Sequence, residues 1–302
     1  MNINEITVNI LSYNRKEYLY ECINSILNQT IKPFKINIFD NGSNKDVYEF
    51  IKPLISEKIN WVGSEQNYGP FWNFNRSINY IKSDYAIFIH DDDKIPSDFL
   101  EKQITFVTDK LFKNFSVITC NGLLISSKGS SLNKFIFNNL TGFQILHNKS
   151  QVVKQCLSSC IPVSPAIINL KNFKNANWDK EYGKCCDVKM FIDAIDFGQI
   201  VINYDVYYEC RIHEGQDSTF FPIRDINKIY NLYYKIAKDS SDSELLNQLK
   251  QTYTNIILSR IKSRIVKNDR KFDIFSSLTG FSKTFFSYKF ALQLIINLKK
   301  KK

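Results

Sequence analysis

The chain has 302 residues, of which 44% are hydrophobic and 23% are charged. It can therefore bury the core of one large α/β domain with a helical appendage and needs no disulfide framework. The formal net charge of +10 is confined to one end, because residues 255–302 contain 12 Lys/Arg and 2 Asp/Glu while the other 254 residues balance to zero. This distribution argues against a nucleic-acid enzyme, whose groove would be lined with positive charge, and favours attachment of the basic end to an anionic membrane surface.

The sequence also indicates a compartment. Its seven cysteines are odd in number and scattered, which is typical of a reducing cytosol. No signal peptide is recognised at the N-terminus, and no run reaches the ~18 apolar residues of a membrane-spanning helix. We therefore expect a cytoplasmic protein, peripheral to the inner face of the cytoplasmic membrane if the basic end holds it there.

The first 120 residues alternate short apolar runs with amphipathic patterns. In chain order they predict a strand at 6–11, a helix around 18–27, a strand at 34–39, a short helix at 48–54, a strand at 59–62, a helix around 71–81 and a strand at 85–89. The last run is apolar throughout, as expected of a parallel strand covered on both faces. This alternation predicts a doubly wound parallel sheet with ligands at the carboxyl ends of its strands.

The rest of the chain is less regular. Residues 121–185 are rich in Ser, Asn and Gly, so long loops are expected there. A helix is predicted at 187–197 and a strand at 200–202. From about residue 225 the pattern is helical to the end, with breaks near 239–243 and 269–280.

Three consecutive carboxylates, Asp91, Asp92 and Asp93, follow the apolar strand at 85–89. At a strand end these charges repel one another, and a divalent cation relieves that repulsion, with oxygen ligands that suit Mg²⁺ or Mn²⁺ on phosphates. The alternative is a solvated acidic turn before the next helix, where acids favour the helix dipole.

Two further polar residues fall near the same edge of the predicted sheet. Asp40 ends the strand at 34–39, where its carboxylate can accept hydrogen bonds from a base or a ribose. The alternative is an Asx-turn, which Asp40-Asn41-Gly42 would form in any case. Asn75 shares a helical face with apolar residues, so its amide needs a partner, either from the protein or from a ligand.

Five segments in this order resemble the family 2 glycosyltransferases of the GT-A fold, over about residues 5–220. They are residues 7–15 (TVNILSYNR), residues 19–29 (LYECINSILNQ), residues 39–43 (FDNGS), the turn Asn67-Tyr68-Gly69 with Asn75, and residues 88–96 (FIHDDDKIP). Each motif is short, but five in register are hard to obtain by chance.

The resemblance implies a GT-A catalytic domain over residues 1–222, with a nucleotide-binding half at 1–120 and an acceptor-binding half at 121–222. A helical, basic and amphipathic extension follows at 223–302. The implied fold is a Rossmann-like, mostly parallel sheet flanked by helices. The implied cofactor is Mn²⁺ or Mg²⁺.

The resemblance also assigns a donor site. It implies that Tyr13, Arg15 and Asp40 hold the nucleoside and that Asp93, with Asp91 or Asp92, binds the metal on the diphosphate. The full set expected at the nucleotide sugar is Tyr13, Asn14, Arg15, Asp40, Asn67, Gly69, Asn75, Asp91, Asp92 and Arg211. The expected metal ligands are Asp93, Asp91 and His213.

The sequence departs from the family pattern at two positions. Asn41 stands where the family often has a second Asp. Phe74 stands where an Arg usually precedes the Asn that matches Asn75, so Arg76 is the substitute to consider at the diphosphate.

The acceptor side rests on later residues. Asp187, at the start of the helix at 187–197, matches the acidic residue that faces the acceptor in the family, which would make it the general base. Such a base is required because the acceptor hydroxyl must lose its proton as it attacks; the alternative is an ordinary acid in a first helical turn. Residues 208–218 resemble a loop that closes over the donor, in which Arg211 could pair with phosphate and His213 could reach the diphosphate or the metal. The alternative for His213 is an ordinary surface or core histidine. Trp178 is expected to pack rather than to stack on a sugar.

Together these features predict an inverting, metal-dependent glycosyltransferase, a hexosyl- or N-acetylhexosaminyltransferase. It would move a sugar from a nucleotide-diphosphate donor, expected to be a UDP-sugar, to a hydroxyl of a glycan or lipid-linked glycan in surface polysaccharide synthesis. One alternative is a metal-dependent sugar nucleotidyltransferase, although no glycine-rich loop follows the first strand. The other is a non-catalytic, membrane-docked carbohydrate-binding protein. The residues from 260 to 302 mix apolar residues with lysines, which suits a helix on anionic lipid or a helix packed on the domain.

Overall fold

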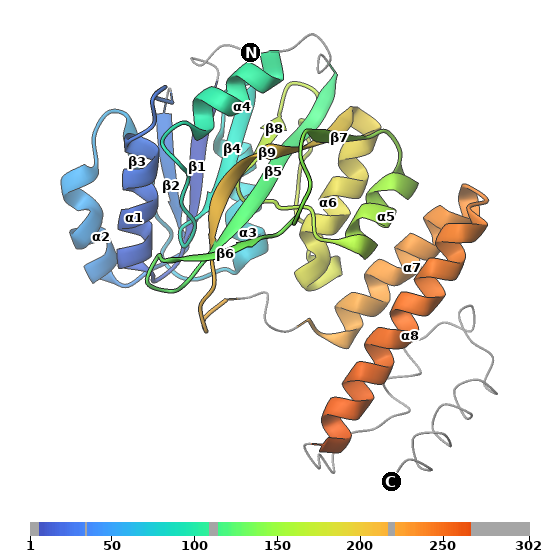
Figure 1. Cartoon of the computed structure of the whole chain (residues 1–302). Helices are drawn as coiled ribbons and strands as arrows, with labels where there is room; N and C mark the ends of the chain where they lie inside the picture. Colours follow the sequence, from blue (N-terminus) through green and yellow to red (C-terminus); the bar gives the residue numbers. More distant parts are fainter. Residues whose placement is uncertain (1–5, 34, 109–113, 217–220, 267–302) are drawn as a thin grey trace. The chain divides into compact units, whose positions relative to one another are not determined.

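The computed structural model describes residues 6–33, 35–108, 114–216 and 221–266. A single nine-stranded sheet runs in the order β3-β2-β1-β4-β8-β5-β9-β7, with β6 paired to β5. Helices flank it on both faces (Figure 1). This is the mostly parallel, helix-flanked α/β architecture that the sequence predicted.

The N-terminal half is the regular part. Its four strands, β3, β2, β1 and β4, are neighbours and all parallel. Their bounds are β1 Ile6–Ser12, β2 Lys35–Asp40, β3 Ile59–Val62 and β4 Tyr85–His90, and the helices between and after them are α1 Lys16–Leu27, α2 Lys45–Ile51, α3 Pro70–Tyr80 and α4 Phe99–Thr108. Each predicted strand and helix of this half is confirmed, with boundaries shifted by a few residues.

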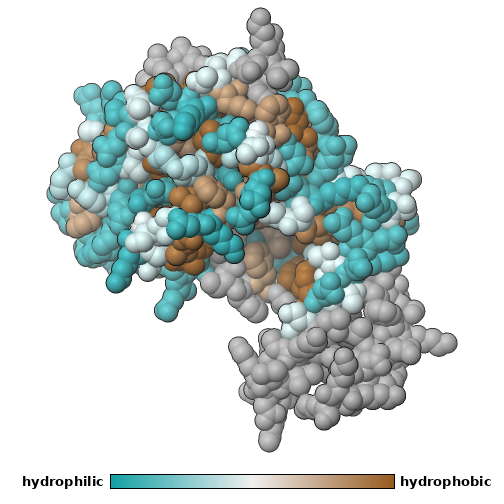
Figure 2. Space-filling view, in the orientation of Figure 1, coloured by the Kyte–Doolittle hydropathy of each residue, from teal (hydrophilic) through white to brown (hydrophobic). Residues whose placement is uncertain are grey.

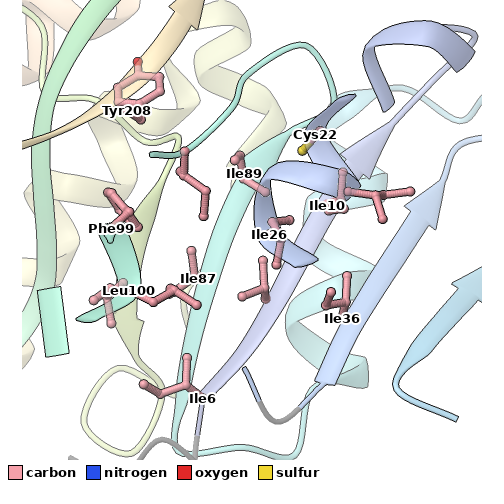
Figure 3. Close-up of a cluster of buried hydrophobic side chains, with 14 of the residues drawn as sticks. Ile6, Ile10, Cys22, Ile26, Ile36, Ile87, Ile89, Phe99, Leu100 and Tyr208 are labelled. Carbon is pink, nitrogen blue, oxygen red and sulfur yellow. The ribbon is translucent and has the colours of Figure 1, made fainter. Parts of the chain in front are cut away.

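One hydrophobic core explains why these elements pack as they do. The alternate side chains Ile6, Val8 and Ile10 of β1 meet Leu19, Ile23 and Ile26 of α1, and all six are fully buried. The same cluster includes Val47 and Ile51 of α2, and Phe99 and Leu100 of α4 (Figure 3), and none of α3. Because successive side chains of a strand point to opposite faces, α3 covers the other face, where Phe74 packs on Phe88 of β4.

The expectation of long loops over 121–185 is wrong for much of that segment. It contains the end of β5 Phe115–Ile125, then β6 Ser131–Phe135, β7 Phe143–Leu146, α5 Lys149–Ser158 and β8 Ala166–Asn169. The strands β6, β7 and β8 have only four or five residues each, too few to show a period, and β6 is largely exposed. Their pairing with β4, β5 and β9 holds them in the sheet.

The next two elements return the chain to the sheet. Helix α6 Cys186–Ala194 continues into a short 3₁₀ turn, Ile195–Phe197. Strand β9 Gln199–Arg211 is far longer than the predicted 200–202 and runs parallel to β5. Its polar second half, Tyr204 to Arg211, lacks the apolar run that marks a buried strand, which is why the sequence pattern stopped early.

The chain divides into two compact units, one of residues 1–180 and 186–219 and one of residues 181–185 and 220–302. In the second unit, α7 Ile223–Asp239 and α8 Ser243–Val266 form a hairpin, with Tyr230 and Tyr253 buried and in edge contact between them. No described helix has the length and apolar character needed to cross a bilayer.

Most of the visible surface is hydrophilic, with apolar residues in separate patches (Figure 2). The amphipathic tail predicted from residue 260 onward lies outside the residues whose side chains are described.

Candidate active site at the carboxyl ends of β1, β2 and β4

The sheet has a topological switch point beside β1. The chain moves from β1 to β2 and β3 on one side and then returns to β4 on the other side, and ligands bind where the strand order reverses in such sheets. Ser12 pairs with Asp40, and Leu11 pairs with His90. The segments that begin at Tyr13, Asn41 and Asp91 therefore leave the sheet side by side.

The backbone of the aspartate triplet is fixed from two directions. The amide of Asp91 donates to the carbonyl of Leu11 in β1 (3.2 Å). Three residues on, Lys94 exchanges a pair of backbone hydrogen bonds with Glu209 of β9 (3.1 and 2.8 Å). Strands β1 and β9 thus hold the three aspartates in a short turn of defined geometry.

Asp91 faces the first loop. Its two oxygens accept from the Tyr13 amide (3.0 Å) and from the Arg15 guanidinium (2.6 Å). Burial raises the pKa of Asp91 to about 6, with the charge of Asp92 adding to the effect and Arg15 opposing it. Tyr13 and Arg15 therefore bind the acidic triplet in this structure.

Asp92 contacts His213, which is 121 positions away in the sequence. Its Oδ2 lies 2.9 Å from His213 Nε2 and 3.4 Å from Arg15. Burial alone would raise the pKa of Asp92, but His90, Arg15 and His213 outweigh burial and lower it. The Gly215 amide donates to His213 Nδ1 (3.2 Å), so in a neutral ring the proton is on Nε2 and points at Asp92.

Asp93 accepts a hydrogen bond on each of its two oxygens. Ser164 Oγ donates to its Oδ2 (2.7 Å), and the Arg211 amide donates to its Oδ1 (3.2 Å). Burial, with the charge of Asp92, raises the pKa of Asp93 well above its usual range. A buried carboxylate next to a second one favours a bound cation.

Among the described residues, one group has the geometry of a metal site. Ligand atoms of His90, Asp92 and Asp93 all lie within 4.8 Å of one another. Two carboxylates with an imidazole form a donor set that suits Mn²⁺. The pKa of Asp93 is raised because its negative charge is buried beside that of Asp92, and a cation bound there would stabilise both charges. The expected trio was Asp93, Asp91 and His213, and of these Asp93 belongs to the group. Asp91 accepts from Arg15, and His213 lies 2.9 Å from Asp92.

Arg211 is a correction to the sequence-based assignment. Its side chain is fully buried, so it does not face a phosphate. Its guanidinium donates to Asp92 O (2.8 Å), Ser127 O (3.0 Å) and Glu21 Oε2 (2.7 Å) and lies over the ring of Tyr18. Arg211 instead ties α1, the aspartate turn and the hairpin after β5 together.

The loop after β2 lies beside the loop after β1 at the same edge of the sheet. Asp40 is buried and accepts from the backbone amide and the hydroxyl of Ser43. These bonds are local, as in the alternative considered, but they reach the residue three positions on rather than the two of an Asx-turn. Asn14 has a left-handed φ of 54°, accepts from the Asn44 amide (2.8 Å) and so clamps the first loop to this one. Tyr13, which is 40% exposed, begins the loop after β1.

The two asparagines in the next motif interlock. Asn41 Nδ2 donates to Asn67 Oδ1 (2.8 Å), and Asn41 Oδ1 accepts from the Tyr68 amide (3.1 Å). An aspartate at position 41 could not make the first bond, which explains the departure from the family pattern. Gly69, with φ of 90°, follows directly and begins α3 with open space around its Cα.

Asn75 and Arg76 both bond to the protein. Asn75 donates to the carbonyl of Trp178 (3.0 Å) and accepts from its amide (2.7 Å), so the protein satisfies the amide. Trp178 packs flat on Phe74 at 4.4 Å, as expected. Arg76 donates to the backbone carbonyls of Asp40, Val62 and Gly63. These bonds hold the ends of β2 and β3 together.

Asp187 is half-buried in the first turn of α6. Burial raises its pKa to about 6, while the Val188 amide (2.8 Å) opposes the shift. After burial, the charge of Asp187 is the largest influence that raises the pKa of Cys160.

Sequence reasoning missed two residues of this site. His90 was visible within the aspartate motif but had no assigned role, and a histidine directly before three acids was the available signal. Ser164 had no signal, because its partner Asp93 is 71 positions away.

Comparison with known proteins agrees with the resemblance to family 2 glycosyltransferases seen in the sequence. Residues 7–140 match the family model for glycosyl transferase family 2. WfaP of Escherichia coli, a UDP-Glc:alpha-D-GlcNAc-diphosphoundecaprenol beta-1,3-glucosyltransferase, is 24% identical over 217 residues, covering 70% of this chain and 79% of WfaP. TuaG of Bacillus subtilis, a glycosyltransferase named for teichuronic acid biosynthesis, is 28% identical over 131 residues, covering 41% of this chain, and this alignment spans about half (49%) of TuaG.

The fold has solved counterparts. The crystal structure of S. aureus TarS 1-349 superposes with a TM-score of 0.60 at 16% identity, covering 96% of this chain and 82% of that one. Its complex with UDP-GlcNAc superposes with a TM-score of 0.58 at 16% identity, covering 82% of this chain and 71% of that one. At this identity the likeness concerns the fold. Residues 7–140 of this chain therefore match glycosyl transferase family 2, and the chain has the fold of these solved structures.

Proposed function

We propose that this chain is an inverting, metal-dependent glycosyltransferase that moves a sugar from a nucleoside-diphosphate donor, expected to be a UDP-sugar, to a hydroxyl of a surface glycan. The observation that carries this proposal is the convergence at one sheet edge of His90, Asp92 and Asp93 with the Asp40 loop. A UDP-GlcNAc complex of TarS and the UDP-glucose named for WfaP support UDP as the nucleotide.

The donor would lie across the switch point. We assign the nucleoside to the loops that carry Tyr13 and Asp40, because an exposed ring and an acceptor carboxylate adjoin there. His90, Asp92 and Asp93 would hold the cation, which neutralises the charge that builds on the diphosphate when it leaves. Arg15 adds a fixed positive charge next to them.

Asp187 would act on the acceptor. Its carboxylate accepts the proton of the attacking hydroxyl as the new C–O bond forms and the bond to the diphosphate oxygen breaks, the electron pair leaving with the nucleoside diphosphate. A carboxyl group with a pKa near 6 is a stronger base than an ordinary aspartate and is still ionised at neutral pH. Attack from the face opposite the diphosphate inverts the anomeric carbon.

The test combines binding and turnover. Thermal-shift screening of nucleotide sugars with and without Mn²⁺ identifies the donor, since the donor stabilises the folded chain. With that donor, Asp187→Asn should keep the dissociation constant and lose about 10²–10⁴-fold in transfer. Asp193→Asn is the matched control, because Asp193 lies on the same helix and pairs with Lys189. Normal turnover by Asp187→Asn would refute its role as base, and release of pyrophosphate from a nucleoside triphosphate would indicate a nucleotidyltransferase instead.

We also propose that the acceptor is a lipid-linked glycan at a membrane surface. WfaP is named for a diphosphoundecaprenol-linked acceptor, and the net charge of +10 within residues 255–302 would favour an anionic surface.

A further inference from the structure

Ser164 lies in the segment between α5 and β8 and is almost fully buried (4% exposed). The segment is anchored to β5, because Thr119 donates its hydroxyl to the carbonyl of Pro162 (2.5 Å). Ser164 is therefore held firmly where it meets the end of β4, although it is far from that strand in the sequence.

The direction of the Ser164 hydroxyl proton follows from its two partners. Its oxygen accepts the backbone N–H of His90 (3.0 Å) and lies 2.7 Å from Asp93 Oδ2. An amide can only donate and a carboxylate accepts, so the single hydroxyl proton points at Asp93. Ser164 thus touches two of the three residues of the metal-ligand group, His90 through its backbone and Asp93 through its side chain.

The second oxygen of Asp93 is held by the Arg211 amide (3.2 Å). One donor on each oxygen fixes the plane of the carboxylate and leaves lone pairs on both oxygens for other partners. Without Ser164 only one of these donors remains, and the like charge of Asp92 next door favours rotation of Asp93 away from the group.

We propose that Ser164 is a positioning residue that fixes the carboxylate of Asp93 for cation binding; this inference rests on the metal site of the proposed function. Removing an outer partner that orients a ligating carboxylate typically weakens metal affinity by about 10–100-fold. Ser164 acts through Asp93 and has no contact with substrate in this scheme.

The test measures Mn²⁺ affinity directly, by the electron paramagnetic resonance signal of free Mn²⁺ with UDP present. Ser164→Ala is expected to weaken binding by about 10–100-fold. Ser164→Thr should restore most of the affinity because it keeps the hydroxyl. The matched control is Ser116→Ala, since Ser116 is also buried and its hydroxyl bonds to the carbonyls of Gly198 and Gln199; it should leave Mn²⁺ affinity unchanged.

Two further readouts separate positioning from general loss of structure. Melting curves without metal should show similar losses for Ser164→Ala and Ser116→Ala, whereas only the former should require more Mn²⁺ for half-maximal transfer. If Ser164→Ala does not fold, Ser164→Cys, which keeps the size with a weaker donor, should show an intermediate affinity.

The outcomes are distinguishable. Wild-type affinity in a folded Ser164→Ala or Ser164→Cys variant would overturn the role of Ser164 and leave the proposed function standing. Absence of Mn²⁺ binding by the wild-type chain would overturn both.

Discussion

Three consecutive aspartates adopt three different chemical states in this protein. Asp91 is paired with Arg15, Asp92 with His213, and Asp93 with Ser164 and the Arg211 amide. The pKa is raised for Asp91 and Asp93 and lowered for Asp92. Residues of one type therefore divide their roles because each meets a different part of the fold.

Asp187 should govern the pH dependence of transfer. A general base works only when ionised, so kcat/KM should fall as the pH decreases through about 6, the value that burial gives the pKa of Asp187. With an ordinary carboxyl pKa of 3.8 the fall would come about two units lower. The measurement is kcat/KM against pH at saturating Mn²⁺; a flat profile between pH 5 and about 7 would contradict the assignment.

The same shift has a cost for stability. Because the folded-state pKa of Asp187 is raised, its contribution is most favourable at low pH and is lost as the pH rises from 3.8 through about 6. Asp187→Asn should therefore raise the melting temperature at pH 8 more than at pH 4.5, an activity–stability trade-off typical of functional acids.

Arg15 should contribute to stability as well as to binding. Removing it leaves the fully buried Asp91 carboxylate without its cation, so Arg15→Ala should destabilise by about 1–3 kcal/mol in urea unfolding. Lys16→Ala is the control, since it breaks an exposed pair with Asp46 that solvent screens. Equal losses in the two variants would mean that the Arg15–Asp91 pair is no stronger than a surface pair.

At the scale of elements, the loop after β2 depends on a glycine. Gly42 has φ of 74°, and a Cβ there would lie 2.3 Å from the backbone of Gln66. Gly42→Ala should separate the two loops that Asn41 and Asn67 join, weaken donor binding and destabilise by more than the ~1–2 kcal/mol of the backbone strain alone.

Gly69→Ala is the comparison for that prediction. Gly69 also has a positive φ, of 90°, but a Cβ would meet nothing within 4 Å. Gly69→Ala should therefore cost only the strain of a backbone conformation (φ 90°, ψ 162°) that is almost confined to glycine, about 1–3 kcal/mol. Equal unfolding free energies for the two variants would show that the close approach of the loops is dispensable.

The elements also show where sequence patterns are informative. The parallel strands β1, β2 and β4 are buried over nearly their whole length, so their apolar runs were readable. The strands β6 and β7 are short and partly exposed, and they form only because β5 and β9 offer them partners. Local patterns cannot report such pairing.

At the scale of the whole molecule, the charge distribution predicts membrane binding. Lys299 to Lys302 end the basic segment, and each lysine near an anionic surface contributes about 1 kcal/mol. Replacing these four by glutamine should reduce co-sedimentation with phosphatidylglycerol vesicles at low salt, with little effect on transfer to a soluble acceptor.

The control removes four charges from elsewhere on the surface. The exposed lysines chosen for it are Lys45, Lys52, Lys58 and Lys82. If both quadruple variants lose vesicle binding equally, total charge rather than the basic end is responsible.

The sequence by itself determined the parallel half of the sheet, the resemblance of residues 7–140 to glycosyl transferase family 2 and the presence of acids at the ends of β2 and β4. These features are local, because strand burial and strand ends are written in consecutive residues. The tertiary structure alone decided that Arg211 is buried, that His90 joins Asp92 and Asp93, and that Ser164 directs Asp93. Those facts depend on contacts such as that between Arg211 and Asp92, 119 positions apart, and only the packing of the strands brings such residues together.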